Sequence, residues 1–379
     1  MTEWNYPKAE ADFYLDELIK SITRVSKSGQ LILGEEVRRF EKEFSDFLGP
    51  NVSPASVLGV ANGTDALELA LRSCGVSKDD FVALPSHTAY ATASAILRIG
   101  AKPLFIDICS NNSTICAQSL SDALTLYKNK IKSVIAVHLY GESCEIESIL
   151  ALCQQWSVPL IEDCAQATGT LYKGRPVGSW GNFACFSFYP TKNLAAFGDG
   201  GALITNASAP IIDYSRRLRM YGWSKSREAI QWGTNSRLDE LQAAFLNTKI
   251  KAFAQRISSR RNLANLYAGA LSELVNNGYI LLPGDGENWK HSYNLYVIKV
   301  LHGRRDSLLK FLATHSIPVA IHYPLPCHLH QHLQGEACLA LPHTNRIIKS
   351  ILSLPLHPYL EEKDIYRVCE CIHAYFNKA

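Results

Sequence analysis

The sequence predicts an α/β fold, in which a mainly parallel, seven-stranded sheet is flanked by helices and followed by a smaller α+β domain. Two observations predict this class. Between residues 57 and 206, short β-branched apolar runs alternate with helical patterns, as in sheets covered by helices on both faces. Near Lys249 the alternation gives way to a long basic helical stretch. A chain of 379 residues, 47% of them hydrophobic, suits two domains. We expect a large domain over residues 1–248 and a small one over 249–379.

The elements follow in chain order. The first fifty residues are predicted to be helical, with a turn at Gly29 and a break at Gly34, and to wrap the large domain or a partner subunit. The predicted strands are 57–61, 81–85, 103–108, 133–139, 158–163, 183–189 and 201–205. Between the first two, the helical stripe of TDALELALRSCG ends at Gly75. The small domain is predicted to hold a helical stretch from Lys249, a strand over 291–300 and a helix over 306–314.

The charge balance and the cysteines limit the partners and the compartment. The chain has 38 basic and 35 acidic side chains, and no sustained block of one sign marks a surface for nucleic acid or anionic lipid. Its 11 cysteines form no C-x-x-C pair, and the N-terminus has no apolar signal core, which favours the cytoplasm. No apolar run is long enough to span a membrane. We therefore expect small molecules or copies of the chain as partners.

Polar residues follow several of the predicted strands, where a parallel sheet has its ligand crevice. Gly63 and Thr64 open a helix after the first strand, and free amides at a helix start suit a phosphate. An Asn-Gly turn with a threonine cap is the alternative. Asp163 ends an apolar run, where a carboxylate needs a positive partner unless it caps the turn at Ala165.

Lys192 stands between an apolar strand and a glycine cluster, in ACFSFYPTKNLAAFGDGGALI. A lone lysine is usually solvated, but the neighbouring glycines leave room near a ligand. A lysine in a pocket with a phosphate site, a carboxylate and a flat ring is what pyridoxal phosphate requires. His87, after the second strand, could supply that ring or be a satisfied core histidine.

The chain resembles the DegT/DnrJ/StrS sugar aminotransferases over nearly its whole length. The resemblance is carried by SGQLILGEEVRRFEKEF, VANGTDALELAL, LPSHTAYATASAI, VHLYGE, IEDCAQATGTLYKGRPVGSWGNFACFSFYPTKNLAAFGDGGALIT, GTNSRLDELQAA, IHYPLPCHL and SLPLHP. It implies the pyridoxal phosphate-dependent transferase fold of type I. It also implies a homodimer whose active sites are shared between chains.

The resemblance further implies roles for particular residues. Lys192 would be the Schiff-base lysine, and Asp163 the catalytic partner of the pyridine nitrogen. The other cofactor-binding residues would be Gly63, Thr64, Ser187, His87, Gln166 and, from the partner subunit, Asn235. Substrate-binding residues would be His322, Tyr323 and Arg237. Asn235 has an alternative as a helix cap ahead of Arg237. The four histidines of residues 322–332 fit no zinc spacing, and no metal is expected.

The same resemblance implies that the enzyme moves an amino group from glutamate to a nucleotide-linked keto-deoxysugar. The motifs resemble enzymes that aminate C3 of deoxythymidine-diphosphate (dTDP) 3-keto-6-deoxyhexoses, but Thr191 and Trp223 depart from them and leave 4-keto sugars open. A dehydratase of the same fold would carry histidine in place of Lys192. A non-catalytic regulator is a further alternative, and a nicotinamide dehydrogenase is excluded because no G-x-G-x-x-G follows the first strand.

Overall fold

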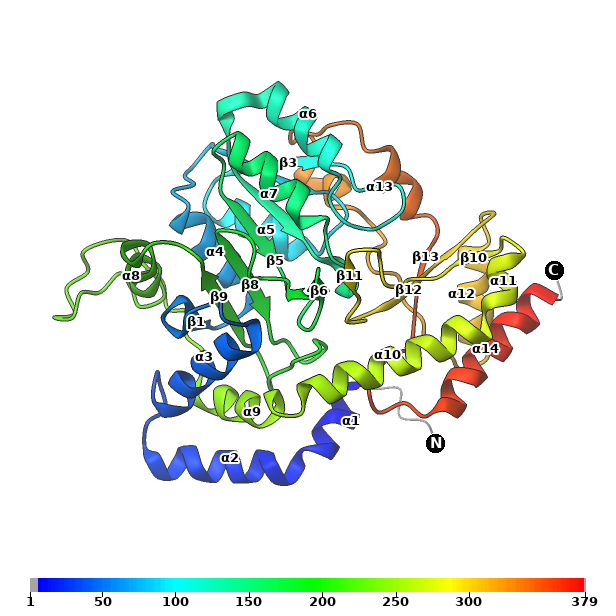
Figure 1. The fold of residues 1–379 in the computed structure, drawn as a ribbon, viewed down its shortest axis with the longest axis horizontal. Coiled ribbons are helices and arrows are strands. Elements are labelled where there is room, and N and C mark those ends of the chain that lie inside the picture. The colour runs from blue at the N-terminus through cyan, green and yellow to red at the C-terminus, as the bar shows by residue number, and fades with distance from the viewer. Residues whose placement is uncertain (1–5, 378–379) are drawn as a thin grey trace.

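The computed structural model describes residues 6–377, and its centre is a seven-stranded sheet in the order β1-β9-β8-β5-β4-β2-β3 (Figure 1). The strands are β1 (Val57–Val60), β2 (Phe81–Pro85), β3 (Lys102–Ile106), β4 (Ile131–Val137), β5 (Leu160–Asp163), β8 (Phe183–Ser187) and β9 (Gly201–Thr205). Within this sheet β9 is antiparallel to both neighbours, and the other pairs are parallel. The predicted α/β fold with a mainly parallel sheet is confirmed.

Helices cover both faces of this sheet, because alternate strand residues point to opposite sides. Val134 and Ala136 of β4 pack into one core layer, and Ile135 and Val137 pack into the other. The first layer is covered by α3 (Glu35–Leu48), α6 (Ala117–Tyr127), α7 (Ile146–Gln155) and α9 (Glu240–Ile250). The second is covered by α4 (Gly63–Ser73), α5 (Tyr90–Arg98) and α8 (Ala209–Leu218). Burial on both faces explains why these strands read as continuous apolar runs.

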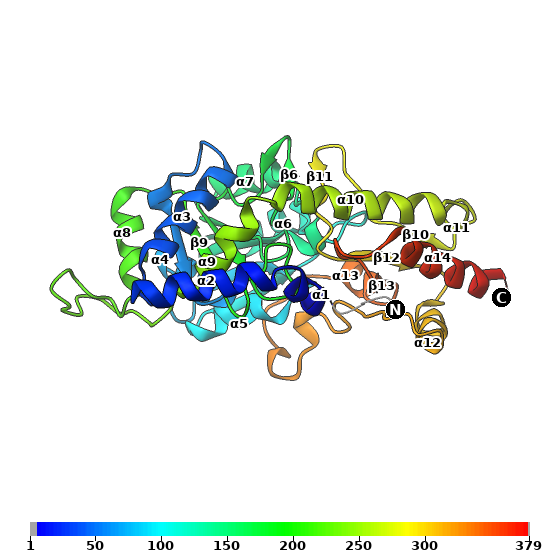
Figure 2. The same ribbon diagram turned by 90° about the horizontal axis from the view of Figure 1, so that it is seen from below.

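The N-terminal arm is helical, as predicted, and lies on the outside of the large sheet. It consists of α1 (Tyr6–Phe13) and α2 (Leu15–Ser28), and it leads into α3. Gly29 ends α2 with a φ of +67°, a conformation that glycine adopts without strain. Figure 2 shows α2 along the outer face of the molecule, in front of α9.

A smaller α+β part lies beside the large sheet, at the right of Figure 1. Its antiparallel sheet consists of β10 (Ile280–Leu281), β12 (Tyr296–Val300) and β13 (Ile351–Leu354). Its helices are α10 (Phe253–Ala270), α11 (Ser272–Asn276), α12 (Arg305–Thr314) and α14 (Glu362–Asn377). The predicted helical stretch from Lys249 is divided, because α9 ends before α10 begins. The predicted strand over 291–300 is shorter than expected, because the amides of Ser292 and Leu295 bond to Gly141 and Tyr140 instead.

The remaining elements are short. They are β6 (Leu171–Tyr172), β7 (Arg175–Pro176), β11 (Trp289–Lys290), α13 (Pro342–Ile347) and the 3-10 turns η1 (Pro54–Ser56), η2 (Lys128–Lys130), η3 (Leu139–Gly141), η4 (Cys327–Leu329) and η5 (Gln331–Leu333). Cys338 forms an isolated backbone β-bridge with Phe105 of β3, so residues near Cys338 pack against the large sheet. The domain boundary near residue 248 stays a prediction. The ends of the two predicted domains, residues 1–5 and 378–379, lie outside the described part of the chain.

Within residues 6–377, no helix combines the length and the apolarity that a membrane span requires. The cytoplasmic location stays a prediction.

Candidate active site

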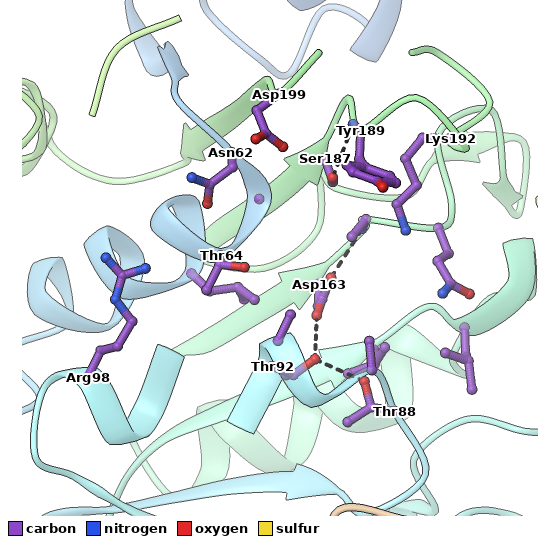
Figure 3. A pocket seen from close by; sticks show the side chains of 18 residues that line it. Asn62, Thr64, Thr88, Thr92, Arg98, Asp163, Ser187, Tyr189, Lys192 and Asp199 are labelled. Carbon is purple, nitrogen blue, oxygen red and sulfur yellow. Dashed lines mark hydrogen bonds between the residues drawn. The ribbon is translucent and has the colours of Figure 1, made fainter. Parts of the chain in front are cut away.

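A cavity of about 490 Å³ lies at the carboxyl ends of the parallel strands (Figure 3). Val137, Asp163 and Ser187 are the last residues of β4, β5 and β8. The other polar or functional lining residues are Asn62, Gly63, Thr64, Thr88, Thr92, Arg98, Gln166, Tyr189, Lys192 and Asp199. The structure therefore brings together Gly63, Thr64, Asp163, Gln166, Ser187 and Lys192, six of the residues selected from the sequence.

Asp163 is a buried carboxylate, with 5% of its surface exposed. Its Oδ2 accepts a hydrogen bond from Thr92 Oγ1 at 2.9 Å, and its Oδ1 accepts one from the Ala165 amide at 3.1 Å. The second contact is the turn cap that the sequence offered as an alternative. Burial raises the pKa of Asp163, while these bonds and the charge of Lys192 oppose the shift. Among the described residues no cation lies within ion-pair distance of this carboxylate, which leaves room for a cationic ligand atom.

Lys192 projects into the same cavity from the loop after β8 (Figure 3). Burial lowers the pKa of its amine to about 8, and the nearby Asp163 charge counters part of this shift. A substantial fraction of the amine is then neutral near physiological pH, as nucleophilic attack and proton transfer require.

The first turn of α4 forms the end of the cavity that suits an anion. Asn62 caps the helix by accepting the Asp65 amide at 2.8 Å, so asparagine takes the role that the sequence alternative gave to threonine. The amides of Gly63 and Thr64 precede the first intrahelical bond, made by Ala66. A Cβ at Gly63 would lie 2.8 Å from Ser187 Cβ. Glycine thus allows the helix start and the serine hydroxyl to face one small space.

Gln166 is oriented by two hydrogen bonds. Its Oε1 accepts the Tyr140 amide at 2.9 Å, and its Nε2 donates to Tyr323 Oη at 2.8 Å. Tyr323 therefore contacts a residue of the cavity wall without lining the cavity. His322 bonds to Ser353 Oγ at 2.8 Å, and its pKa is lowered by burial and by the charge of Lys192.

His87 is not among the cavity-lining residues. Its ring is fully buried, Nε2 lies 2.6 Å from Tyr140 Oη, and Nδ1 has no hydrogen-bond partner among the described residues. Burial lowers its pKa to about 4, so the ring is neutral. Its stacking role stays a prediction.

Asn235 and Arg237 lie outside this cavity and line a separate one of about 320 Å³. Asp199 lines both cavities, so the two are neighbours. The alternative of Asn235 as a helix cap is wrong, because α9 begins only at Glu240 with Asp239 as its cap. The chain by itself does not bring Asn235 to Ser187 and Lys192.

The side chains that could bind a metal, histidines above all, make separate hydrogen bonds within the protein. His328 bonds to Ser86 and His332 to Tyr90. His138, Glu162 and Cys164 have potential ligand atoms within 4.8 Å of one another in the buried core. The Glu162 oxygens accept hydrogen bonds from His138 and from the amides of residues 178, 180 and 181, which satisfies that carboxylate without an ion.

Sequence reasoning missed Thr92 and Tyr140. Thr92 lies on α5, and its contact with Asp163 depends on how that helix packs against α4 and β3. Tyr140 has a φ of +63° and contacts both His87 and Gln166. No sequence pattern predicts a tyrosine with a left-handed backbone conformation, because that conformation is usually expected at glycine.

The residues of the cavity fit pyridoxal phosphate. A buried carboxylate without a cation suits a protonated pyridine nitrogen, and Lys192 supplies an amine with a lowered pKa for the aldehyde. The amides of Gly63 and Thr64 with the Ser187 hydroxyl suit the phosphate.

Comparisons with known proteins give one consistent family. The sequence model of the DegT/DnrJ/EryC1/StrS aminotransferase family matches residues 14–373. A dTDP-3-amino-3,4,6-trideoxy-alpha-D-glucose transaminase of Micromonospora megalomicea subsp. nigra is 37% identical over 94% of each chain. A dTDP-3-amino-3,6-dideoxy-alpha-D-galactopyranose transaminase of Aneurinibacillus thermoaerophilus is 37% identical over 96% of each chain.

Solved structures agree with this similarity. DesV of S. venezuelae, solved in complex with a ketimine intermediate, superposes with a TM-score of 0.91 at 34% identity, covering 97% of this chain and 96% of that one. A Bacillus subtilis structure with bound cofactor PMP has a TM-score of 0.84 at 27% identity, covering 94% of this chain and 82% of that one.

Proposed function

This chain belongs to the DegT/DnrJ/EryC1/StrS aminotransferase family and is a pyridoxal phosphate-dependent sugar-nucleotide aminotransferase, and from that premise we propose that it aminates C3 of a dTDP-linked 3-keto-6-deoxyhexose. Enzymatic activity of this class sets aside the non-catalytic regulator. The observation that carries the proposed active site is the meeting of Lys192, Asp163 and the start of α4 in one cavity.

We assign the roles of the site residues as follows. When bound, pyridoxal phosphate supplies an aldehyde that takes up the amino group and a ring that withdraws electrons from the carbon losing its proton. Lys192 holds the cofactor covalently between turnovers. Asp163 keeps the ring nitrogen protonated, and Thr92 and the Ala165 amide keep Asp163 in place. Gly63, Thr64 and Ser187 hold the phosphate.

Lys192 also moves the proton. Its free amine would move a proton from the donor's α-carbon to C4′ of the cofactor, and in the second half-reaction from C4′ to the sugar carbon that carried the keto oxygen. A pKa of about 8 suits both directions, because both the charged and the neutral amine are populated between pH 7 and pH 8. We propose glutamate as the donor, as the family resemblance implies.

The substrate proposal has two supports. Both curated relatives described above are named for 3-amino sugars linked to dTDP. Tyr323 accepts a hydrogen bond from Gln166, which lines the cavity, and His322 lies near enough to Lys192 for that charge to lower its pKa, so we propose that the sugar enters beside these two residues. Amination of a 4-keto sugar is the second candidate, because Thr191 directly before Lys192 departs from the pattern of the C3 enzymes.

We further propose a homodimer whose active sites take residues from both chains. Leu15, Ile19 and Ile22 form a stripe on α2, and they are 53%, 54% and 44% exposed. A second copy of the chain would cover this stripe. Asn235 and Arg237, which line the neighbouring cavity, would complete the partner's site rather than their own.

The substrate proposal is tested with a panel of sugars. The purified enzyme is incubated with glutamate and with dTDP-linked 3-keto and 4-keto 6-deoxyhexoses, and the new amine is located by NMR. We expect the amine at C3. Amination of the 4-keto sugars alone would contradict the proposal and support the second candidate.

A further inference from the structure

The loop between β8 and β9 carries Lys192 and is fixed from the inside of the molecule. The Asn193 side chain donates to the carbonyl oxygens of Thr168 at 3.3 Å and Ser292 at 3.0 Å. The Lys192 amide bonds to Tyr189 O at 2.8 Å, and the Ala196 amide bonds to Phe188 O at 2.7 Å. These contacts set the path of the loop but leave the carbonyl groups of Lys192 and Ala195 to other partners.

The N-terminal helix α1 supplies one of those partners. Tyr6 Oη lies 3.2 Å from the carbonyl oxygen of Lys192 and 3.1 Å from Glu10 Oε1, so its hydroxyl proton is shared between the two acceptors. The Tyr6 ring also stacks on Tyr359 and faces the Arg260 guanidinium. A residue far away in the sequence thus reaches the backbone of the cofactor lysine.

A buried ion pair supplies the second partner. Lys249 of α9 is 0% exposed, Glu10 is 4% exposed, and the two side chains meet at 2.8 Å. Lys249 also donates to the carbonyl oxygen of Ala195. Among the described residues, Glu10 is the one carboxylate within ion-pair distance of Lys249. Because an unpaired buried ammonium is strongly unfavourable, Glu10 on docked α1 stabilises the charged Lys249 that donates to this carbonyl.

We propose that α1 is a clamp that positions Lys192, with Tyr6, Glu10 and Lys249 as its positioning residues. Together they close a hydrogen-bonded path from the carbonyl of Lys192 to that of Ala195, in addition to the contacts of Asn193. The lysine side chain has four rotatable bonds, so a fixed backbone limits where its amine can lie. Displacements of about 1 Å at a reacting group can cost about a hundredfold in rate. The proposal rests on the role of Lys192 proposed above.

The clamp is tested by amide hydrogen exchange on the full-length chain, with and without cofactor. In Glu10→Gln we expect the amides of residues 189 and 191–197 to exchange about tenfold faster, while those of β5 keep their protection. Asp12→Asn is the matched control, because it removes a carboxylate from the same helix, where Asp12 pairs with Lys8 at the surface. It should leave the loop unchanged. Unaltered exchange in Glu10→Gln would overturn the proposal.

A second variant separates positioning from general stability. Glu10→Gln/Lys249→Met removes the unpaired buried charge, so its melting temperature should recover toward the wild-type value. The loop should still exchange about tenfold faster, and kcat should fall about threefold to tenfold while KM for the sugar is unchanged. If loop exchange returned to the wild-type rate together with the melting temperature, the ion pair would be merely structural and the clamp would be refuted. Exchange without cofactor does not depend on chemistry at Lys192, so failure of the proposed function would be seen separately.

Discussion

The carboxyl edge of the large sheet and the surface segment around Asn235 and Arg237 are built differently. At the sheet edge, Asp163 and Ser187 are 5% and 9% exposed, and Asp163 has two hydrogen-bond donors from its own chain. Asn235 is exposed and lines a separate cavity, and Arg237 is half-buried beside it. These two contacts of Asp163 come from within one chain. The second region lies outside the cavity that holds Lys192, and under the proposal above it would act with a partner subunit or a substrate.

This difference separates two tasks. Groups that hold and activate a cofactor need fixed positions and a low-dielectric surrounding, which the packed end of a parallel sheet provides. Residues that select a sugar or complete a neighbouring site can lie on loops, where sequence changes do not disturb the core. Changes at the sheet edge should therefore affect chemistry, and changes at the surface segment should affect assembly and substrate.

The largest effect is expected at Lys192. Lys192→Ala removes both the covalent anchor and the group that moves the proton, so turnover should fall below detection. Turnover is followed by the amine formed on the nucleotide sugar. A normal rate in this variant would show that another residue carries out the reaction, and the contrast between the two regions would then be wrong.

Asp163→Ala comes next. It takes the carboxylate away from a buried cationic ring nitrogen, which costs about 3–5 kcal/mol. If this loss is felt in the transition state, kcat should fall by about two to four decades. Single-turnover rates with saturating cofactor provide the measurement. Asp199→Asn, at the boundary of the two cavities, is the control and should lose far less.

Ser187→Ala should affect retention of the cofactor more than chemistry. A hydrogen bond to a charged phosphate contributes about 1.5–3 kcal/mol, so the cofactor Kd should rise about tenfold to a hundredfold. Cofactor loss on dialysis is compared with the single-turnover rate of the loaded variant. Equal losses in both quantities would mean that Ser187 acts in the chemical step.

The pH dependence of cofactor attachment follows from burial of Lys192. Its pKa is lowered from 10.5 to about 8, and only the neutral amine attacks the aldehyde. Attachment to the cofactor-free protein should therefore rise about tenfold between pH 7 and pH 8.5 and then level off. A rate that still rises between pH 9 and pH 10 would show a lysine with an ordinary pKa.

The smallest change in activity is expected from dimers that combine two different variant chains. Lys192→Ala and Asn235→Asp each inactivate their own homodimer, the second by setting a carboxylate beside the partner's phosphate. When the two are co-expressed in equal amounts, half of the dimers are hybrids with one intact site, so about a quarter of the wild-type activity should return. No recovery in purified hybrids would mean that Asn235 serves its own chain.

Sequence reasoning predicted the sheet edge well for a physical reason. Strands buried on both faces give continuous apolar runs, so the strands were found and Asp163 was placed at the end of its strand. The strand predicted over 183–189 ends two residues earlier, at Ser187. The strand predicted over 291–300 was too long, because its first residues bond to η3 rather than to a neighbouring strand. That contact joins parts of the chain distant in sequence, and no local pattern reports it.

The missing parts of the site have the same origin. Thr92 of α5, a helix that packs against α4 and β3, contacts Asp163 of β5, and Tyr140 contacts Gln166 through an unusual backbone conformation. The contacts of Tyr6, Glu10 and Lys249 join α1, α9 and the loop after β8, which are far apart in the sequence. Such contacts depend on tertiary structure, whereas the residues at strand ends are fixed by local sequence.

The most direct test of the central claim is borohydride reduction of the enzyme loaded with pyridoxal phosphate, followed by mass spectrometry of its peptides. The account predicts one phosphopyridoxyl group per chain, attached to Lys192. A tag on any other residue, or none at all, would contradict it.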